Sequence, residues 1–198
     1  MIAGRRRRIG IFGGTFDPIH VGHLVAAVNA RVAADLDELL LVVSNSPWQK
    51  EGSRAITPAE MRFRLVEDAV RGVDGLRASD IEIRRGGSSY TVDTVNELAG
   101  LDPKSDIVLV VGADAAAGLS TWHRFEELAK CVELVVVNRP GAIVEPEALS
   151  DWNVTFVEVP SLAVSSTEIR KRVVDGRPLD FLVSRHTIEF IASHRLYS

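Results

Sequence analysis

Short runs of this sequence are apolar at almost every position, and they limit the folds that the chain can adopt. They read "LLLVVS" at 39–44, "IVLVVG" at 107–112 and "ELVVVN" at 133–138. A strand with one face in water alternates apolar and polar residues, whereas a strand buried on both faces is apolar throughout. The runs therefore predict a sheet that helices cover on both faces. The expected strands are 9–13, 39–44, 78–83, 106–112, 133–138 and 154–159.

Amphipathic stretches lie between the expected strands. In 21–34, apolar residues recur at every fourth position and form one stripe. The stretch 57–70 opens with a capping box, in which Thr57 is the N-cap, Pro58 is the first helical residue and Glu60 is at N3. This alternation predicts an α/β fold with a doubly wound, mostly parallel sheet and right-handed crossovers, in which ligands bind beyond the carboxyl ends of the strands. Further helices are expected at 92–99, 122–130, 166–175 and 187–194.

The length of the chain, 198 residues, is that of one ordinary domain. No stretch is rich enough in Gly, Pro or Ser to be a linker between domains. We expect a solvated basic tail at 1–8 and a single domain at 9–198, with 139–153 as a surface loop.

Charge and composition exclude several classes of protein. The formal net charge of −4, from 27 acidic and 23 basic residues, argues against broad electrostatic capture of nucleic acid. No apolar run reaches the roughly 18 residues of a spanning helix, and the run after "RRRR" at 5–8 is too short for a signal peptide. A cytoplasmic protein without a membrane partner is expected. Cys131 is the only cysteine, which excludes internal disulfides, and we expect it to be buried.

The segment "GGTFDPIHVGH" at 13–23 follows the first expected strand. Gly13 and Gly14 let the backbone turn sharply and approach a ligand without a Cβ in the way. A phosphate fits such a turn, yet the spacing of the glycines is not G-x-G-x-x-G and the chain has no G-K-[ST]. A nicotinamide dehydrogenase and a P-loop enzyme are therefore disfavoured.

Two histidines stand at the start of the helix that follows this turn. Because Pro18 disfavours helix at Asp17, we expect the helix to begin just after it, with His20 and His23 on one face of its first turn. Two imidazoles beside unpaired backbone N–H groups and the positive end of the helix dipole form a donor cluster suited to an anion. Zinc binding is the alternative, but the other histidines show no ligand spacing.

A second motif, "SSTEIR" at 165–170, has two compatible interpretations. Ser165 as N-cap, Glu168 at N3 and a hydrophobic staple from Val164 make a complete helix start. Capping does not require an arginine, and Ser166 and Arg170 share a helix face, which places a guanidinium beside another helix N-terminus. The two N-termini can meet on one triphosphate if their parent strands are neighbours in the sheet.

The two motifs resemble those of the class I nucleotidyltransferases, which carry H-x-G-H after the first strand and S-S-T-x-x-R near the C-terminus. The resemblance implies transfer of a nucleoside monophosphate to a phosphate, with release of pyrophosphate. Further segments make the resemblance closest to the bacterial nicotinate-nucleotide adenylyltransferases over nearly the whole chain. These segments are "PWQK" at 47–50, "SYTVDT" at 89–94, "GADA" at 112–115, Trp122 and "NRPG" at 138–141.

This resemblance implies a reaction and roles for particular residues. AMP passes from ATP to nicotinate mononucleotide by in-line attack without a covalent intermediate, which yields deamido-NAD, and Mg²⁺ arrives with ATP rather than at a protein metal site. The implied catalytic residues are His20, His23 and Arg170. The implied ATP and phosphate ligands are Gly13, Gly14, Thr15, Phe16, Lys50, Gly112, Asp114, Arg139, Ser165, Ser166 and Thr167, and the implied pyridine-nucleotide ligands are Tyr90, Thr91 and Trp122.

Alternatives remain open from the residues alone. Lys50 has an equally good interpretation as a solvated side chain, and Tyr90 and Trp122 as core aromatics. Phosphopantetheine adenylyltransferases and other nucleotidyltransferases share both motifs. A non-catalytic ATP-binding sensor and a nucleic-acid-binding module that uses the arginine tail are the alternatives from other classes. The loop "SPWQK" departs from many relatives, which have a second proline and a histidine before the lysine.

Overall fold

The computed structural model describes residues 5–47, 55–138, 149–160 and 162–198. Its centre is a six-stranded sheet in the order β3-β2-β1-β4-β5-β6, and every pair of neighbouring strands is parallel. This confirms the prediction of a doubly wound parallel sheet. The strands are β1 (Arg8–Gly14), β2 (Glu38–Val43), β3 (Leu76–Ser79), β4 (Asp106–Gly112), β5 (Glu133–Asn138) and β6 (Val154–Glu158).

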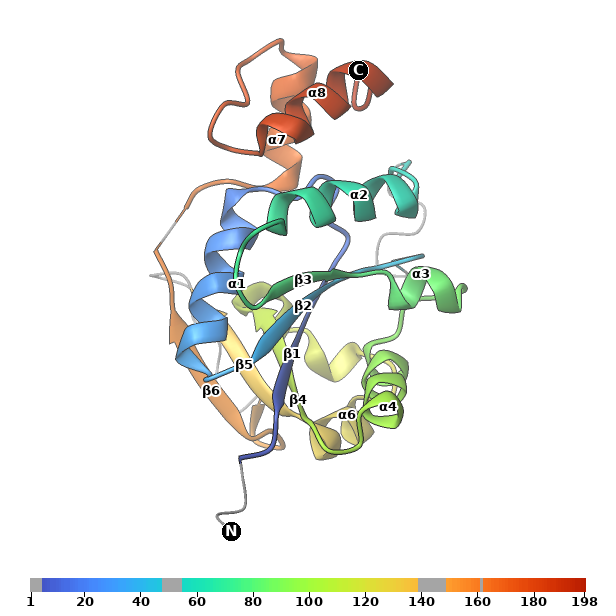
Figure 1. Ribbon diagram of the computed structural model, residues 1–198, viewed down its shortest axis with the longest axis vertical. Coiled ribbons are helices and arrows are strands. Elements are labelled where there is room, and N and C mark those ends of the chain that lie inside the picture. The colour runs from blue at the N-terminus through green and yellow to red at the C-terminus, as the bar shows by residue number, and fades with distance from the viewer. Residues whose placement is uncertain (1–4, 48–54, 139–148, 161) are drawn as a thin grey trace.

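Helices cover both faces of the sheet (Figure 1). Helices α1 and α2 pack on one face, α4 and α6 lie on the other, and α7 and α8 form a pair next to α2 and the start of α1. The helices are α1 (Val21–Ala33), α2 (Ala59–Val70), α3 (Ile81–Arg85), α4 (Thr91–Leu101), α5 (Ala113–Ala116), the 3₁₀ helix η2 (Leu119–Thr121), α6 (Phe125–Cys131), α7 (Ser166–Val174) and α8 (Arg185–His194).

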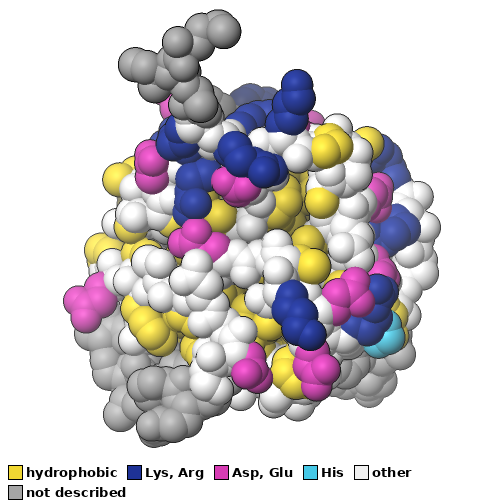
Figure 2. Space-filling model, turned by 90° about the horizontal axis from the view of Figure 1, so that it is seen from below, with side chains coloured by type: hydrophobic (Ala, Val, Ile, Leu, Met, Phe, Trp, Pro, Cys, Tyr) yellow, Lys and Arg dark blue, Asp and Glu magenta, His cyan; other side chains and the backbone are white. Residues whose placement is uncertain are grey.

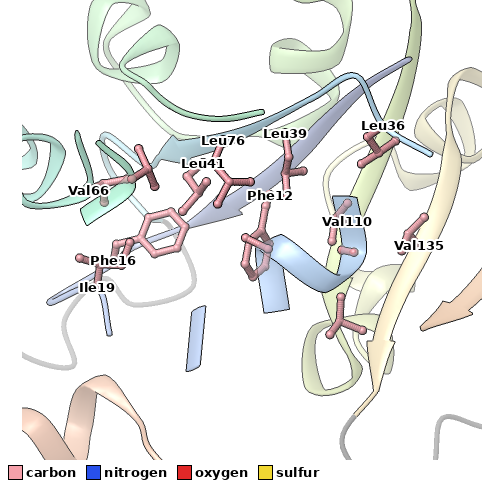
Figure 3. Packing of buried hydrophobic residues seen from close by; sticks show 14 of the residues in the cluster. Phe12, Phe16, Ile19, Leu36, Leu39, Leu41, Val66, Leu76, Val110 and Val135 are labelled. Carbon is pink, nitrogen blue, oxygen red and sulfur yellow. The ribbon is translucent and has the colours of Figure 1, made fainter. Parts of the chain in front are cut away.

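The buried strands divide their side chains between two cores. Phe12, Leu41 and Val110 point to the α1 and α2 side, where Figure 3 shows them with Phe16 and Val66. Their neighbours in the same strands point to the α4 and α6 side, because successive residues of a strand face opposite sides. The near-continuous apolar runs of the sequence arise from this double burial.

Strand β1 marks the point where the strand order reverses. It pairs with β2 on one side and with β4 on the other. The helix that follows β1, α1, lies on one face of the sheet, and α6, which follows β4, lies on the other. The carboxyl ends of β1 and β4 therefore border a crevice, which is where open α/β sheets bind ligands. Gly13 and Gly14 stand at the end of β1, and Gly112 stands at the end of β4.

Two predicted elements differ from the structure by more than one or two residues at an end. The expected strand 78–83 is β3 (Leu76–Ser79) followed by α3, because the alternation of Ile81 and Ile83 belongs to a short helix that buries Ile81 and ends in arginines. The expected helix 122–130 begins only at Phe125. Trp122 is extended, and Arg124 has a left-handed φ of 54°. Residues of an α-helix have a φ near −63°, so the helix cannot include Arg124.

The predicted capping box at Thr57 is wrong. The N-cap of α2 is Pro58, and no side-chain hydrogen bond caps the helix. The Thr57 hydroxyl instead lies 3.3 Å from the hydroxyl of Tyr197, to which it donates. The Thr57 hydroxyl therefore makes a tertiary hydrogen bond instead of the local capping bond that the sequence predicted.

Arg62 is a buried arginine that the sequence analysis did not single out. It lies on α2 with 1% of its surface exposed, and its guanidinium donates to backbone carbonyls of three segments. The acceptors are Thr57 at 2.7 Å, Thr15 at 2.7 Å, Ser44 at 2.8 Å and Asn45 at 3.2 Å. Arg62 therefore joins the loop after β1 to the loop after β2.

The basic segment 5–8 is held against acidic residues at the amino ends of the strands. Arg8 belongs to β1 and pairs with Glu133 at 2.8 Å, while Arg5 pairs with Asp37 at 2.8 Å. The hydrogen bond from the Arg8 amide and the charge of Arg5 lower the pKa of Asp37. Figure 2 shows this side of the molecule, where basic and acidic side chains are interspersed, an arrangement that does not favour nucleic acid.

Two other expectations concern Cys131 and the membrane. Cys131 is exposed, contrary to the prediction, because it is the last residue of α6. Within the described ranges, the structure has no helix that is long and apolar enough to cross a bilayer.

Replacement of Arg62 tests how strongly the two loops depend on it. Arg62→Ala should lower the free energy of unfolding by about 3 kcal/mol or more, because several buried carbonyls lose a charged donor. Arg62→Lys should give a smaller loss, since an ammonium group cannot reproduce the planar fork. Urea denaturation measures both. The exposed Arg64 on the same helix supplies the control, and an Arg62→Ala loss no larger than that of Arg64→Ala would contradict this role.

Candidate active site

The first helix start contains both predicted histidines. His20 is the N-cap of α1, with φ −148° and ψ 169°, and His23 is at N3. Their rings stack with centroids 3.8 Å apart and an interplanar angle of 25°. The His20 amide donates to Nδ1 of His23 at 3.3 Å. Because Nδ1 of His23 accepts this bond, the neutral ring carries its proton on Nε2, which is a donor.

Some backbone N–H groups of this helix start are already bonded, contrary to the expectation that they are unpaired. The amide of Val21 donates to the carbonyl of Leu182 at 2.9 Å, and the amide of His23 donates to the carbonyl of His20 at 2.9 Å. The donor character of this end therefore depends more on the imidazoles than the sequence analysis assumed.

The turn before the helix places Phe16 beneath His23. Phe16 is buried with a left-handed φ of 48°, and its ring meets the His23 ring edge to face at 5.0 Å. A Cβ on Gly14 would lie 2.7 Å from the Phe16 ring, so this position needs a glycine. A Cβ on Gly13 would meet no protein atom within 4 Å, so that glycine borders open space.

The second helix start is capped as predicted. The hydroxyl of Ser165 accepts a hydrogen bond from the amide of Glu168 at 3.1 Å, and Val164 and Ile169 are buried in one cluster, as a hydrophobic staple requires. The carboxylate of Glu168 pairs with Arg172 at 3.1 Å. It is therefore held along the helix.

Direct hydrogen bonds join the two motifs. Arg170 donates from Nη1 to the carbonyl of Asp17 at 2.7 Å, and Ser166 donates from its hydroxyl to the carbonyl of Pro18 at 2.9 Å. Nη2 of Arg170 also donates to the Thr167 hydroxyl at 3.0 Å, which orients the guanidinium. The N-terminus of α7 therefore lies against the loop that leads into α1.

The two motifs meet through helices and not, as the sequence predicted, through neighbouring parent strands. Their parent strands β1 and β6 are not neighbours, since β4 and β5 lie between them. The contact is made by α7 and α8, which pack on the start of α1 through an apolar cluster that includes Ile169, Val183 and Val21. Figure 1 shows this helix pair above α2 and the start of α1.

A pocket of about 270 Å³ opens at the carboxyl ends of β1 and β4. It brings together residues that the sequence analysis assigned to ATP and residues that it assigned to the pyridine nucleotide. Of the predicted residues, those that line it are Gly13, Gly14, Thr15, Gly112, Tyr90, Thr91 and Trp122.

Two further pocket residues were missed by the sequence analysis. The ring of His123 stacks on that of Tyr90, with centroids 4.3 Å apart and an interplanar angle of 29°. Glu82 is buried at the pocket wall and accepts a hydrogen bond from Thr94 at 2.7 Å. Sequence carried a signal only for His123, which directly follows the predicted Trp122.

The other predicted site residues that the structure describes do not line this pocket; they are Phe16, His20, His23, Asp114, Ser165, Ser166, Thr167 and Arg170. Asp114 is exposed in the first turn of α5 and is not among the pocket-lining residues. Lys50 and Arg139 lie outside the described residues. Among the described residues, no group of three or more His, Cys, Asp or Glu side chains could hold a metal ion.

The sequence of this chain is similar to those of known proteins. The family model described as Cytidylyltransferase-like matches residues 11–172. A relative from Leifsonia xyli subsp. xyli, named a probable nicotinate-nucleotide adenylyltransferase, is 41% identical over 192 residues, 97% of this chain and 94% of the relative. A relative of the same name from Corynebacterium kroppenstedtii is 42% identical over 192 residues, 96% of this chain and 90% of the relative.

The fold is also similar to that of a solved structure. The structure of Plasmodium falciparum nicotinic acid mononucleotide adenylyltransferase complexed with NaAD aligns with a TM-score of 0.80 and 19% identity. The alignment covers 96% of this chain and 97% of that chain. This likeness supports the doubly wound architecture.

The same added methyl group should impair stability at one glycine of the turn and ATP binding at the other. Gly14→Ala should lower the free energy of unfolding by about 1–3 kcal/mol, because the Cβ collides with the Phe16 ring. Gly13→Ala should change it by less than about 0.5 kcal/mol but weaken ATP binding about tenfold, because its methyl group enters the pocket. Thermal unfolding and calorimetric titration with ATP measure the pair. Equal destabilisation by both changes would contradict the assignment.

Proposed function

Because the chain belongs to the cytidylyltransferase-like family, and within it to the nicotinate-nucleotide adenylyltransferases, we propose the reaction that it catalyses. The enzyme transfers the adenylyl group of ATP to nicotinate mononucleotide and releases deamido-NAD and pyrophosphate. The observation that carries the assignment is the junction of two helix N-termini at Asp17 and Pro18, beside a pocket with an aromatic wall.

The chemistry requires no nucleophile from the protein. A phosphate oxygen of nicotinate mononucleotide attacks the α-phosphorus of ATP in line, and the bond to the bridging oxygen of pyrophosphate breaks. Transfers of this kind are catalysed mainly by positioning the reactants and by stabilising charge on phosphate oxygens. Paired donors at a helix N-terminus are suited to both tasks.

The two histidines of α1 are proposed to hold α- and β-phosphate oxygens. His23 contributes its Nε2–H, since its Nδ1 already accepts the His20 amide. His20 is almost fully buried and stacked on His23, so the two rings keep a fixed relation. Fixed donors need little reorganisation when negative charge builds on the leaving pyrophosphate.

The start of α7 is proposed to bind the β- and γ-phosphates. Arg170 is oriented by its bonds to the Asp17 carbonyl and the Thr167 hydroxyl. The Ser166 hydroxyl is engaged with Pro18, so Ser165, Ser166 and Thr167 would contribute through backbone N–H groups. The dipole of a helix that begins at Ser166 favours the anion further.

The pocket is proposed to take the nucleosides and the pyridine ring. Tyr90, Thr91 and Trp122 would border the ring, because an indole or phenol face can stack on a pyridinium. The remaining proposed ATP ligands are Gly13, Gly14, Thr15, Phe16, Gly112 and Asp114, and Lys50 and Arg139 are proposed to contact phosphates.

Magnesium is proposed to enter as part of the MgATP substrate. Mg²⁺ keeps several waters and is commonly bound through substrate phosphates, which suits a site whose donors are imidazoles, a guanidinium and backbone amides. When bound, the ion neutralises phosphate charge. The side chains of this chain then need to position the triphosphate.

The acceptor assignment is tested by pyrophosphate release from MgATP with three separate acceptors. Nicotinate mononucleotide should support strong release, whereas phosphopantetheine should support none. Nicotinamide mononucleotide measures the contribution of the carboxylate. Release with phosphopantetheine alone would overturn the acceptor. ATP binding without release for any acceptor would support the sensor hypothesis instead.

Replacement of His23 tests the catalytic assignment. His23→Ala should lower kcat by about 10²–10³, the effect of removing one preorganised donor from a developing anion. His186 on α8 is exposed, so His186→Ala should leave kcat within about twofold, as surface changes away from a site generally do. Pyrophosphate release at saturating substrates measures both, with circular dichroism as the check on folding. Near-normal turnover of His23→Ala would contradict the role.

A further inference from the structure

The carboxylate of Asp17 is buried within the phosphate-binding motif, and the sequence analysis gave it no role. Asp17 is 1% exposed and lies between Phe16 and Pro18. Its Oδ1 accepts a hydrogen bond of 2.7 Å from the hydroxyl of Tyr197. A buried carboxylate requires such donors, because leaving it without them is costly.

Tyr197 reaches this carboxylate from the segment after α8. The residue is half-buried, has a left-handed φ of 66° and packs against the small apolar core of α7 and α8. Its hydroxyl also accepts from Thr57 at 3.3 Å. The phenol therefore ties Asp17 to the segment before α2 and to the helix pair that carries the second motif.

The backbone on both sides of the same carboxylate is held by the second motif. Arg170 binds the Asp17 carbonyl and Ser166 binds the Pro18 carbonyl. Asp17 is thus fixed through its main chain by α7 and through its side chain by Tyr197. Three residues later His20 is the N-cap of α1, so the orientation of Asp17 influences where the histidine pair lies.

The protonation state of Tyr197 suits the role of donor. Burial raises the pKa of its hydroxyl far above the usual value, and the adjacent Asp17 carboxylate raises the pKa further. The phenol therefore keeps its proton across the neutral pH range. Its contribution to stability is fully present below the unfolded-state pKa of about 10 and is lost only above it.

We propose that Tyr197 is a positioning residue for adenylyl transfer, which acts through Asp17 to hold the phosphate-binding loop between the two helix starts. The proposal rests on the proposed function in one respect, that ATP binds at this loop. Tyr197 does not touch the reacting atoms in this account. It sets the place of groups that do.

Removal of the Tyr197 hydroxyl gives the direct test. Tyr197→Phe keeps the ring in the apolar core and removes the donor to Asp17. The KM for MgATP should rise about 5–10-fold, the size expected from loss of one charge-assisted hydrogen bond, and the KM for nicotinate mononucleotide should stay within twofold. Thr57→Val removes the other hydrogen bond of the same hydroxyl, and it should leave both KM values within twofold. Equal increases in both KM values, or no change, for Tyr197→Phe would overturn the proposal.

Asp17→Asn keeps the proposal testable if Tyr197→Phe folds poorly, because it weakens the same hydrogen bond from the acceptor side, and a double-mutant cycle adds a test where both variants fold. Asp17→Asn preserves size but weakens the hydrogen bond, so it should raise the KM for MgATP in the same direction. The double variant should be no worse than the more impaired single variant, because both changes break one interaction. Fully additive effects would overturn the proposal.

Failure of the proposed function would have a different signature. Calorimetric titration of the wild-type chain and Tyr197→Phe with a non-hydrolysable ATP analogue needs no acceptor. Absence of pyrophosphate release from the wild type would contradict the reaction, while a 5–10-fold weaker affinity of Tyr197→Phe for the analogue would still support the role of Tyr197. Equal affinities would overturn that role even if the wild type is active.

Discussion

Two backbone carbonyls, those of Asp17 and Pro18, hold the candidate site together. They accept hydrogen bonds from Arg170 and Ser166 and so join segments about 150 residues apart in sequence. A guanidinium bonded to a carbonyl is oriented without being neutralised, since the carbonyl carries no charge. Arg170 therefore remains a cation for a phosphate while its position is fixed. The proposed triphosphate site depends on this arrangement.

The parallel sheet provides the place for this junction but does not produce it alone. Because β1 lies in the interior of the strand order and β6 at its edge, their ends are separated by two other strands. The helix pair α7 and α8 spans that separation by packing on α1. Arg62 on α2 anchors the loops after β1 and β2. The histidine motif is easy to recognise in the sequence, but the contacts of α7, α8 and Arg62 that hold it in place are not.

Local patterns predicted the fold well, and tertiary contacts limited the prediction of the site. Double burial explains the success for β2, β4 and β5, and the Ser165 cap was predicted because its bond is local. Thr57 failed because its hydroxyl bonds to Tyr197, a residue far along the chain. No spacing rule could predict that pairing. The roles of the individual site residues, Lys50 and Arg139 included, remain proposals.

The most direct measurement is a crystal structure of the chain with a non-hydrolysable ATP analogue and Mg²⁺. The account predicts one triphosphate between the two helix starts, with its oxygens within hydrogen-bond distance of His20, His23 and Arg170. The hydrogen bonds of Arg170 and Ser166 to the Asp17–Pro18 backbone should persist. A triphosphate that contacts only one of the two motifs, or that binds elsewhere on the sheet, would contradict the account.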